Sequence, residues 1–207
     1  MATVCVPAIA MADMQGAPPA EGGVPAETAL AAMNAPPASK LRIGLNVVPM
    51  PYGQLKAEVG NVSASTDAAF AFGIMPFVDY LVTPNFFVGF SPSLTLNVKA
   101  SDGRGSAGKE FDLMLRLGGQ APISDVMQLY GYLTPGYSIV TNPDSSDSAK
   151  GFALGIHAGA MYSVSPTVFL NGELGYQIGY QKVSVGSADV DFKLSYMQIA
   201  LGGGIRL

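Results

Sequence analysis

The amino-acid sequence predicts an all-β protein, an eight-stranded antiparallel up-and-down transmembrane β-barrel with short turns at one end and longer loops at the other. From Gly151 to Lys182, large apolar side chains recur at every second position, as in a strand with one apolar and one polar or small face. The chain is 49% hydrophobic and only 13% charged, whereas soluble domains carry about 25% charged residues. No stretch approaches the roughly 18 consecutive apolar residues of a membrane-spanning helix. A closed barrel is the other structure that satisfies every backbone group in hydrocarbon.

The residues before the predicted barrel differ from it in composition. Residues 1–12 resemble the remnant of a secretory signal peptide, because an apolar run ends in the small-x-small sequence Ala10-Met11-Ala12. Residues 13–39 are rich in Ala, Pro and Gly and lack the large apolar side chains that offset the entropy of ordering, so we interpret them as a disordered linker. The transmembrane barrel is expected over residues 40–207.

The first four strands are expected at about 40–50, 67–80, 86–100 and 109–120, with a long loop over 51–66. Each shows the alternation of period two, and it is clearest on the third, where Phe, Val and Leu alternate with Gly, Ser, Thr and Asn. The apolar side chains are expected on the outer, lipid-facing surface: Leu41, Ile43, Leu45, Val47, Phe70, Phe72, Ile74, Val78, Phe86, Val88, Phe90, Leu94, Leu96, Val98, Phe111, Leu113, Leu115 and Leu117.

The last four strands comprise one at about 128–141, the two strands of the 151–182 hairpin, and one at about 189–207. The first of these is ambiguous in phase, and we favour Leu129, Leu133, Tyr137 and Ile139 on the outer surface. The last strand changes parity: Phe192, Leu194 and Tyr196 share one face, whereas Met197, Ile199, Leu201 and Ile205 continue on the other. One extra residue in a β-bulge near Tyr196-Met197 would restore a continuous apolar face.

The connections between these strands alternate in character. Those at 83–85, 121–126 and 163–167 are short and contain proline, whereas those at 51–66, 101–108, 142–149 and 184–188 are longer or more polar. Short periplasmic turns and longer extracellular loops are typical of outer-membrane barrels. An even number of strands also returns both ends of the barrel to the short-turn rim.

Residues 40–207 resemble the small eight-stranded outer-membrane barrels of Gram-negative bacteria, the OmpA/OmpX-type class and the outer membrane protein β-barrel domain family. The segments that carry the resemblance are Leu129-Tyr130-Gly131-Tyr132 into Pro135-Gly136-Tyr137, Glu173-Leu174-Gly175-Tyr176, and 197–207. The resemblance implies a porin-like fold in the cell outer membrane and insertion by the barrel assembly machinery. Members usually end in an aromatic residue that this machinery recognises, whereas this chain has Leu207.

The charged residues of the strands sort onto the face that does not meet lipid, where a charge is far less costly. We expect a polar network in the lumen formed by Arg42, Asp79, Asp112, Arg116, His157, Glu173 and Arg206. Within it, Glu173 is expected to pair with Arg116, and Asp79 to neutralise Arg42 and Arg206. Lys99, Asp191 and Lys193 are assigned to the same inner face.

These observations favour a non-enzymatic outer-membrane barrel with a side-chain-filled lumen, serving envelope structure or surface interaction through its loops. The expected partners are outer-membrane lipids, and a net charge of −4 offers no basic surface for nucleic acid. No cofactor or metal is expected, because the single Cys5 and the single His157 supply no ligand set.

Three alternatives stay open. The lumen could form a narrow pore or carry a small ligand. A lipid-modifying enzyme could use His157 as general base to a serine, with Glu173 orienting the histidine; Ser163 and Ser165 fall at the turn that follows the histidine's strand. A soluble calyx such as a lipocalin could turn its apolar face inward, because alternation alone does not distinguish inside from outside.

Overall fold

The computed structural model describes residues 39–59, 62–101, 107–141, 148–185 and 188–207. All of these residues belong to one of the two units into which the chain divides, the unit Pro36–Leu207. The predicted signal-peptide remnant (1–12) and all but the last residue of the predicted linker (13–39) lie outside the described residues. The described residues contain no helix with the length and apolar character needed to cross a membrane.

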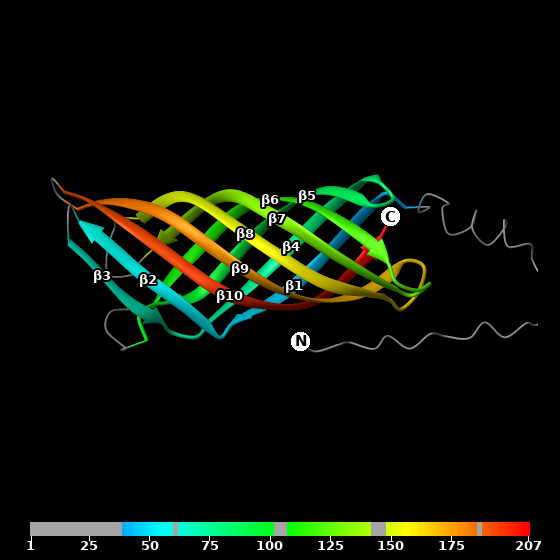
Figure 1. The fold of residues 1–207 in the computed structure, drawn as a ribbon, viewed down its shortest axis with the longest axis horizontal. Helices are drawn as coiled ribbons and strands as arrows, with labels where there is room; N and C mark the ends of the chain where they lie inside the picture. The colour runs from blue at the N-terminus through cyan, green and yellow to red at the C-terminus, as the bar shows by residue number, and fades with distance from the viewer. Residues whose placement is uncertain (1–38, 60–61, 102–106, 142–147, 186–187) are drawn as a thin grey trace, which may run out of the picture. The chain divides into compact units, whose positions relative to one another are not determined.

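The predicted eight-stranded antiparallel barrel is confirmed (Figure 1). The closed cylinder has the order β1-β4-β5-β6-β7-β8-β9-β10, and pairing between β1 and β10 seals it. Two further strands, β2 and β3, extend the sheet beyond β10. The strands are β1 (Leu41–Met50), β2 (Tyr52–Val59), β3 (Val62–Ala68), β4 (Ala71–Thr83), β5 (Phe86–Val98), β6 (Gly108–Pro122), β7 (Met127–Thr141), β8 (Ser148–Ser163), β9 (Val168–Val185) and β10 (Ala188–Arg206).

Alternate residues of each strand point outward, and on the cylinder most of these are large and apolar. Leu45 and Leu115 are about half exposed, at 51% and 52% of their surface. The phase favoured for the ambiguous strand β7 is correct, because Leu129, Leu133 and Tyr137 are exposed while Tyr130 and Tyr132 are buried inside. An outward apolar band with a polar interior is the arrangement of a membrane barrel. The soluble-calyx alternative is therefore wrong.

The segment 51–66, expected to be a long loop, is for the most part a β-hairpin made of β2 and β3. Strand β10 is long enough to pair with β1 along its last part and with β2 along its first part. Strand β2 thereby continues the path of β1, and β3 returns toward β4. In Figure 1 the hairpin lies at the left end of the barrel, away from the C-terminus. The prediction failed because one edge of β2 is paired by β10, a strand far away in sequence.

The β-bulge expected near Tyr196-Met197 is not formed, since β10 pairs with β9 in one unbroken register from Ala188 to Ile205. The extra residue lies instead on the neighbouring strand. Val47 pairs with Leu201 and Tyr52 with Met197, so five steps along β1–β2 face four steps along β10.

Because β10 keeps its phase, its first half presents the opposite face from the one predicted. Leu194 and Tyr196 point inward and are buried, whereas Asp191 and Lys193 are exposed on the outside. The inner pair packs in an apolar cluster with Val48, Met50 and Met75. The assignment of Asp191 and Lys193 to the lumen is therefore wrong.

A second correction concerns the end of β5. The register with β6 shifts between Leu96 and Val98, and Asn97 has φ 66°. This left-handed residue reverses the alternation, so Val98 is buried inside although it was expected on the outer surface. Lys99 lies beyond the end of the strand and is half-buried, and its expected place on the inner face of β5 does not hold.

The three short connections lie at one rim, together with both ends of the barrel. The turn 83–86 and the bends at 123–126 and 164–167 are at the right in Figure 1, where the C-terminus also lies. The backbone of Leu41 and Leu207 joins the two ends, with the Leu207 N–H donating to the Leu41 carbonyl at 2.9 Å. The hairpin β2–β3 and the starts of the longer connections are at the opposite end, which we call the long-loop end.

Candidate functional site

The lumen holds six of the seven side chains expected there: Arg42, Asp79, Asp112, Arg116, His157 and Glu173 are each at most 4% exposed. They come from β1, β4, β6, β8 and β9 and point inward because they share the parity opposite to the lipid-facing side chains. Arg206 is half-buried at the short-turn rim. It donates to the Ser163 hydroxyl at 2.9 Å and lies over the Phe169 ring, so the expected contact with Asp79 is not made.

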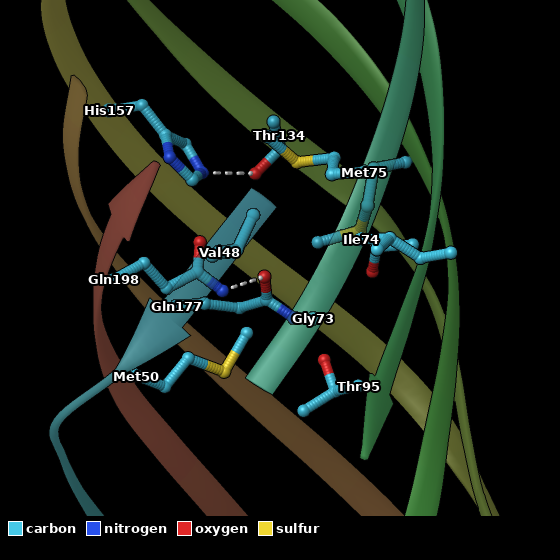
Figure 2. A pocket seen from close by; sticks show the side chains of 12 residues that line it. Val48, Met50, Gly73, Ile74, Met75, Thr95, Thr134, His157, Gln177 and Gln198 are labelled. Atoms are coloured by element: carbon cyan, nitrogen blue, oxygen red, sulfur yellow. Dashed lines mark hydrogen bonds between the residues drawn. The ribbon is translucent and has the colours of Figure 1, made fainter. Parts of the chain in front are cut away.

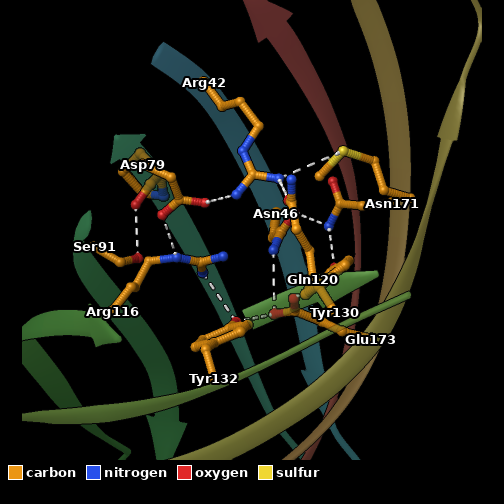
Figure 3. Close-up of polar contacts among 12 residues, drawn as sticks. Arg42, Asn46, Asp79, Ser91, Arg116, Gln120, Tyr130, Tyr132, Asn171 and Glu173 are labelled. Carbon is orange, nitrogen blue, oxygen red and sulfur yellow. Dashed lines mark hydrogen bonds and ion pairs between the residues drawn. The ribbon is translucent and has the colours of Figure 1, made fainter. Parts of the chain in front are cut away.

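Asp79 is the acidic centre of the network, and it binds two arginines (Figure 3). Its Oδ1 accepts from Arg116 Nε at 2.9 Å, and its Oδ2 accepts from Arg42 Nη2 at 3.4 Å. Both guanidinium groups also stack on lumen aromatics, with Arg116 4.5 Å from the Phe77 ring centroid and Arg42 4.8 Å from that of Phe87. Stacking of this kind suits the planar guanidinium group and reduces the cost of its burial.

Glu173 does not form the direct ion pair expected with Arg116. The Tyr132 hydroxyl lies between them, accepting from Arg116 Nη1 at 2.9 Å and donating to Glu173 Oε1 at 2.5 Å. Glu173 also accepts from the Tyr130 hydroxyl at 2.8 Å and from Asn46 at 3.3 Å. The buried Glu173 carboxylate thus accepts hydrogen bonds from three donors, and Arg116 forms its ion pair with Asp79 instead.

Several members of this network were not predicted. Asn46, Gln120, Tyr130, Tyr132 and Asn171 all contribute hydrogen bonds inside the lumen. Asn46 lies between the outward-facing Leu45 and Val47, so the alternation of the strand could have predicted that it points into the lumen. The two tyrosines were harder to assign, because Tyr and Trp are also the residues that gather at membrane interfaces.

His157 is held in a narrow slot. Its ring stacks on Tyr132 with 4.6 Å between centroids and 7° between planes, and its Nε2 lies 3.3 Å from the Thr134 hydroxyl (Figure 2). A Cβ atom at Gly175 would lie 2.3 Å from His157 Nδ1, and one at Gly155 would lie 2.7 Å from Nε2. These two glycines are needed because the imidazole ring occupies the space where their side chains would stand.

A second polar cluster lies nearer the long-loop end. Asp112 accepts from Ser93 at 2.8 Å and from Gln177 at 2.9 Å, and Glu110 accepts from Ser138 at 2.8 Å. Both carboxyl groups are 1% exposed, and each keeps one oxygen without a hydrogen-bond partner. Among the residues described, neither acid forms an ion pair, in contrast to Asp79.

Between the two polar clusters lies a layer that contains three methionine side chains beside polar ones, and we call it the methionine layer. Met50, Met75 and Met114 line it with Val48, and on the wall beside them Gln198 of β10 donates to Gln177 of the neighbouring β9 at 2.9 Å (Figure 2). The cavity left at this level has a volume of about 10 Å³. That is close to the smallest space that can hold one water molecule, so side chains fill the lumen at this level.

The described side chains of the interior form hydrogen bonds and compensate one another's charges. His157 faces Thr134 and Tyr132. Ser163 accepts from Arg206, and the Ser165 hydroxyl accepts from backbone N–H groups of its own turn. The histidine–serine pair considered from sequence is thus not assembled. The described residues contain no group of three or more His, Cys, Asp or Glu side chains suited to hold a metal ion.

Comparison with known proteins identifies a family and structures with a similar fold. The family model of the outer membrane protein beta-barrel domain matches residues 25–206, and no curated protein matches the chain. The structure is similar to outer membrane protein OprG from Pseudomonas aeruginosa, with 15% identity over 81% of this chain and 94% of that chain and a TM-score of 0.58. It is also similar to the attachment invasion locus protein Ail of Yersinia pestis, with 18% identity over 82% and 99% of the two chains and a TM-score of 0.47.

At 15% identity the OprG structure supports the fold alone, whereas the family model covers most of the chain. Together with the closed eight-stranded cylinder and its outward apolar band, the match places the protein in the cell outer membrane. The chain belongs to the outer membrane protein beta-barrel domain family.

Proposed function

We propose that this protein is a non-enzymatic outer-membrane barrel that serves envelope structure or surface interaction through its long-loop end, and that its lumen does not conduct. The observation that carries the proposal is the filled interior. Two polar clusters and the methionine layer between them occupy the axis, and the cavity in that layer has room for about one water molecule. An eight-stranded barrel is just wide enough for side chains to fill it.

The long-loop end offers the surface for such interactions. Residues Val62–Asp67 of β3 are all exposed, and most of them are small or polar. β3 pairs with β2 on one side, and it is the last strand in the sheet order. Polar, exposed segments carried on a rigid barrel are suited to contact other molecules outside the membrane.

The lumen part of the proposal is tested by single-channel recording in planar bilayers with the refolded full chain. We expect no steady conductance. Arg116→Ala removes a plug residue, and Leu115→Ala on the outer face of the same strand is its matched control. Steady conductance of the unaltered protein that changes in size or ion selectivity with Arg116→Ala, but not with Leu115→Ala, would overturn the proposal and favour a narrow pore.

The non-enzymatic part is tested separately. Purified protein is incubated with outer-membrane lipids, and the lipids are analysed by mass spectrometry. We expect unchanged lipid chemistry, because the only histidine is buried, stacked and hydrogen-bonded to a threonine. A lipid product that disappears with His157→Ala, while the variant remains folded, would establish the lipid-modifying alternative instead.

A further inference from the structure

Four lysines gather on the outer surface near the long-loop end, on four strands that lie side by side in the order β8, β9, β10, β2. We call Lys56, Lys150, Lys182 and Lys193 the lysine patch. Directly paired positions across these strands give two rows. The upper row, nearer the long-loop end, is Lys150, Lys182, Asp191 and Glu58. The lower row is Phe152, Tyr180, Lys193 and Lys56. All eight residues are on the outer face and are exposed, except for the half-buried Lys56.

The patch contains two pairs of lysines at directly opposite positions on neighbouring strands. Lys150 is the direct cross-strand partner of Lys182, and Lys193 is that of Lys56. Like charges at such positions destabilise a sheet. Lys182 is relieved by Asp191 at 3.2 Å and Lys56 by a contact with Glu58. Within the described part of the chain, Lys150 and Lys193 form no ion pair, so the patch keeps a surplus of two positive charges.

The height of the patch matches the surface of the membrane. The Phe152 and Tyr180 rings lie beside the lysines, and the Lys193 Nζ is 5.4 Å from the Tyr180 ring centroid. Below them the outer face continues with Leu154 and Tyr176, which are 43% and 45% exposed. Aromatic rings mark the level of the lipid head groups on membrane barrels. Ammonium groups beside and above these rings therefore lie at the level expected for the phosphates of outer-leaflet lipids.

A hollow of about 430 Å³ accompanies the patch and is lined by Lys56, Lys182, Lys193 and Tyr180, with Glu58 and Asp191 among the other residues. This volume falls in the range of sites for small organic ligands. The two acids disfavour a purely anionic ligand and suit a head group that also carries hydroxyl groups, because carboxylates accept their hydrogen bonds. We infer that the lysine patch binds the phosphorylated sugar head group of an outer-leaflet lipid.

The test uses the full chain refolded in zwitterionic detergent, with native mass spectrometry to measure bound lipid. The probes are diphosphorylated lipid A, the same lipid without its phosphates, and inorganic phosphate. The patch variant is Lys150→Gln with Lys193→Gln. The matched control is Lys40→Gln with Lys109→Gln, which removes the same charge from exposed lysines outside the patch. The heat-dependent gel shift of each variant verifies that the barrel is folded.

We expect the unaltered protein to prefer the diphosphorylated lipid, and the patch variant to bind it about 30-fold more weakly, since each lysine near a charged membrane surface contributes roughly 1 kcal/mol. The control should bind like the unaltered protein, and Lys150→Arg with Lys193→Arg should retain binding. Equal loss in the control, no preference for phosphorylated lipid, or equally tight binding of inorganic phosphate would each overturn the inference. It is independent of whether the lumen conducts.

Discussion

The Tyr132 hydroxyl donates a hydrogen bond to the Glu173 carboxylate at 2.5 Å in the middle of the barrel. The same oxygen accepts from Arg116 at 2.9 Å, so the Tyr132 hydroxyl connects Arg116 and Glu173, which do not contact each other directly. Arg116 and Glu173 are each at most 4% exposed. In such an environment hydrogen bonds to charged groups contribute more than those between neutral groups.

Replacing Tyr132 by Phe removes both hydrogen bonds and keeps the ring on His157. We expect the free energy of unfolding to fall by about 2 kcal/mol, because two charged groups each lose a partner. Urea titration of the refolded protein in lipid vesicles measures this change. Tyr137→Phe on the same strand is the control, since Tyr137 is exposed on the outer surface, and it should change stability by no more than about 0.5 kcal/mol. Equal losses in the two variants would contradict the bridging role.

Asp79→Asn leaves two buried guanidinium groups without their shared acid. The expected cost is about 3–5 kcal/mol, the usual consequence of removing one partner from a buried ion pair. Asp191→Asn supplies the comparison, because its ion pair with Lys182 is exposed and pairs of that kind contribute about 0–1 kcal/mol. If Asn at position 79 were tolerated as well as Asn at position 191, Asp79 would not be the centre of the network.

Glu110→Gln and Glu173→Gln are expected to have opposite effects. Glu110 is buried with one oxygen unpartnered, so an amide removes an uncompensated charge while still accepting from Ser138, and stability should rise or stay unchanged. Glu173 accepts from three donors, and an amide would present its N–H₂ group to one of the tyrosine hydroxyls, so about 1–3 kcal/mol should be lost. The difference between their urea midpoints is the measurement. A larger loss for Glu110→Gln would refute this account.

Gly175→Ala would place a methyl group 2.3 Å from His157 Nδ1. Displacing the imidazole ring from its stack should cost about 1–3 kcal/mol, as overpacking of a filled interior does. Gly131→Ala is a control, because there the nearest atom is 3.5 Å away. Combining Gly175→Ala with His157→Ala should cost less than the sum of the two single changes. Strict additivity in this double-mutant cycle would show that the two residues do not compete for space.

Alternation predicted most of the barrel, since a strand between lipid and a polar lumen must repeat with period two. It also predicted that Arg116 and Glu173 face inward, since either charge on the lipid side would be too costly. Alternation failed where the chain breaks its own period. At Asn97, φ of 66° reverses the phase, and Val98 turns inward. At the β1–β2 junction the extra residue lies between Val47 and Tyr52, in a segment with two prolines. The sequence had suggested that the bulge would lie on β10.

The pairing of charges was less predictable than their direction. In the sequence, Arg116 lies six residues before Pro122 and Glu173 six residues after Thr167, which predicts one height for both, and Tyr132 connects them. The height of two side chains in the barrel does not identify which of them are in contact. Contact also depends on where their strands lie around the cylinder, and counting along the sequence does not give this position. Leu194 and Tyr196 were misplaced for a related reason: their partners on β1 and β2 lie about 140 residues or more away in sequence.

The contacts around Glu173 and Arg116 bear on how the barrel is completed. Glu173 on β9 receives its donors from β7 and β1, and Arg116 on β6 reaches Asp79 on β4; in each case another strand lies between the two in the sheet order. Only the contact between Asn46 on β1 and Glu173 on β9 spans the seam where β1 pairs with β10, because β10 lies between those two strands. The other two contacts lie within runs of neighbouring strands and do not cross that seam. Sealing of β1 against β10 therefore supplies Glu173 with its third donor, so the last step of assembly also completes the solvation of this buried acid by protein groups.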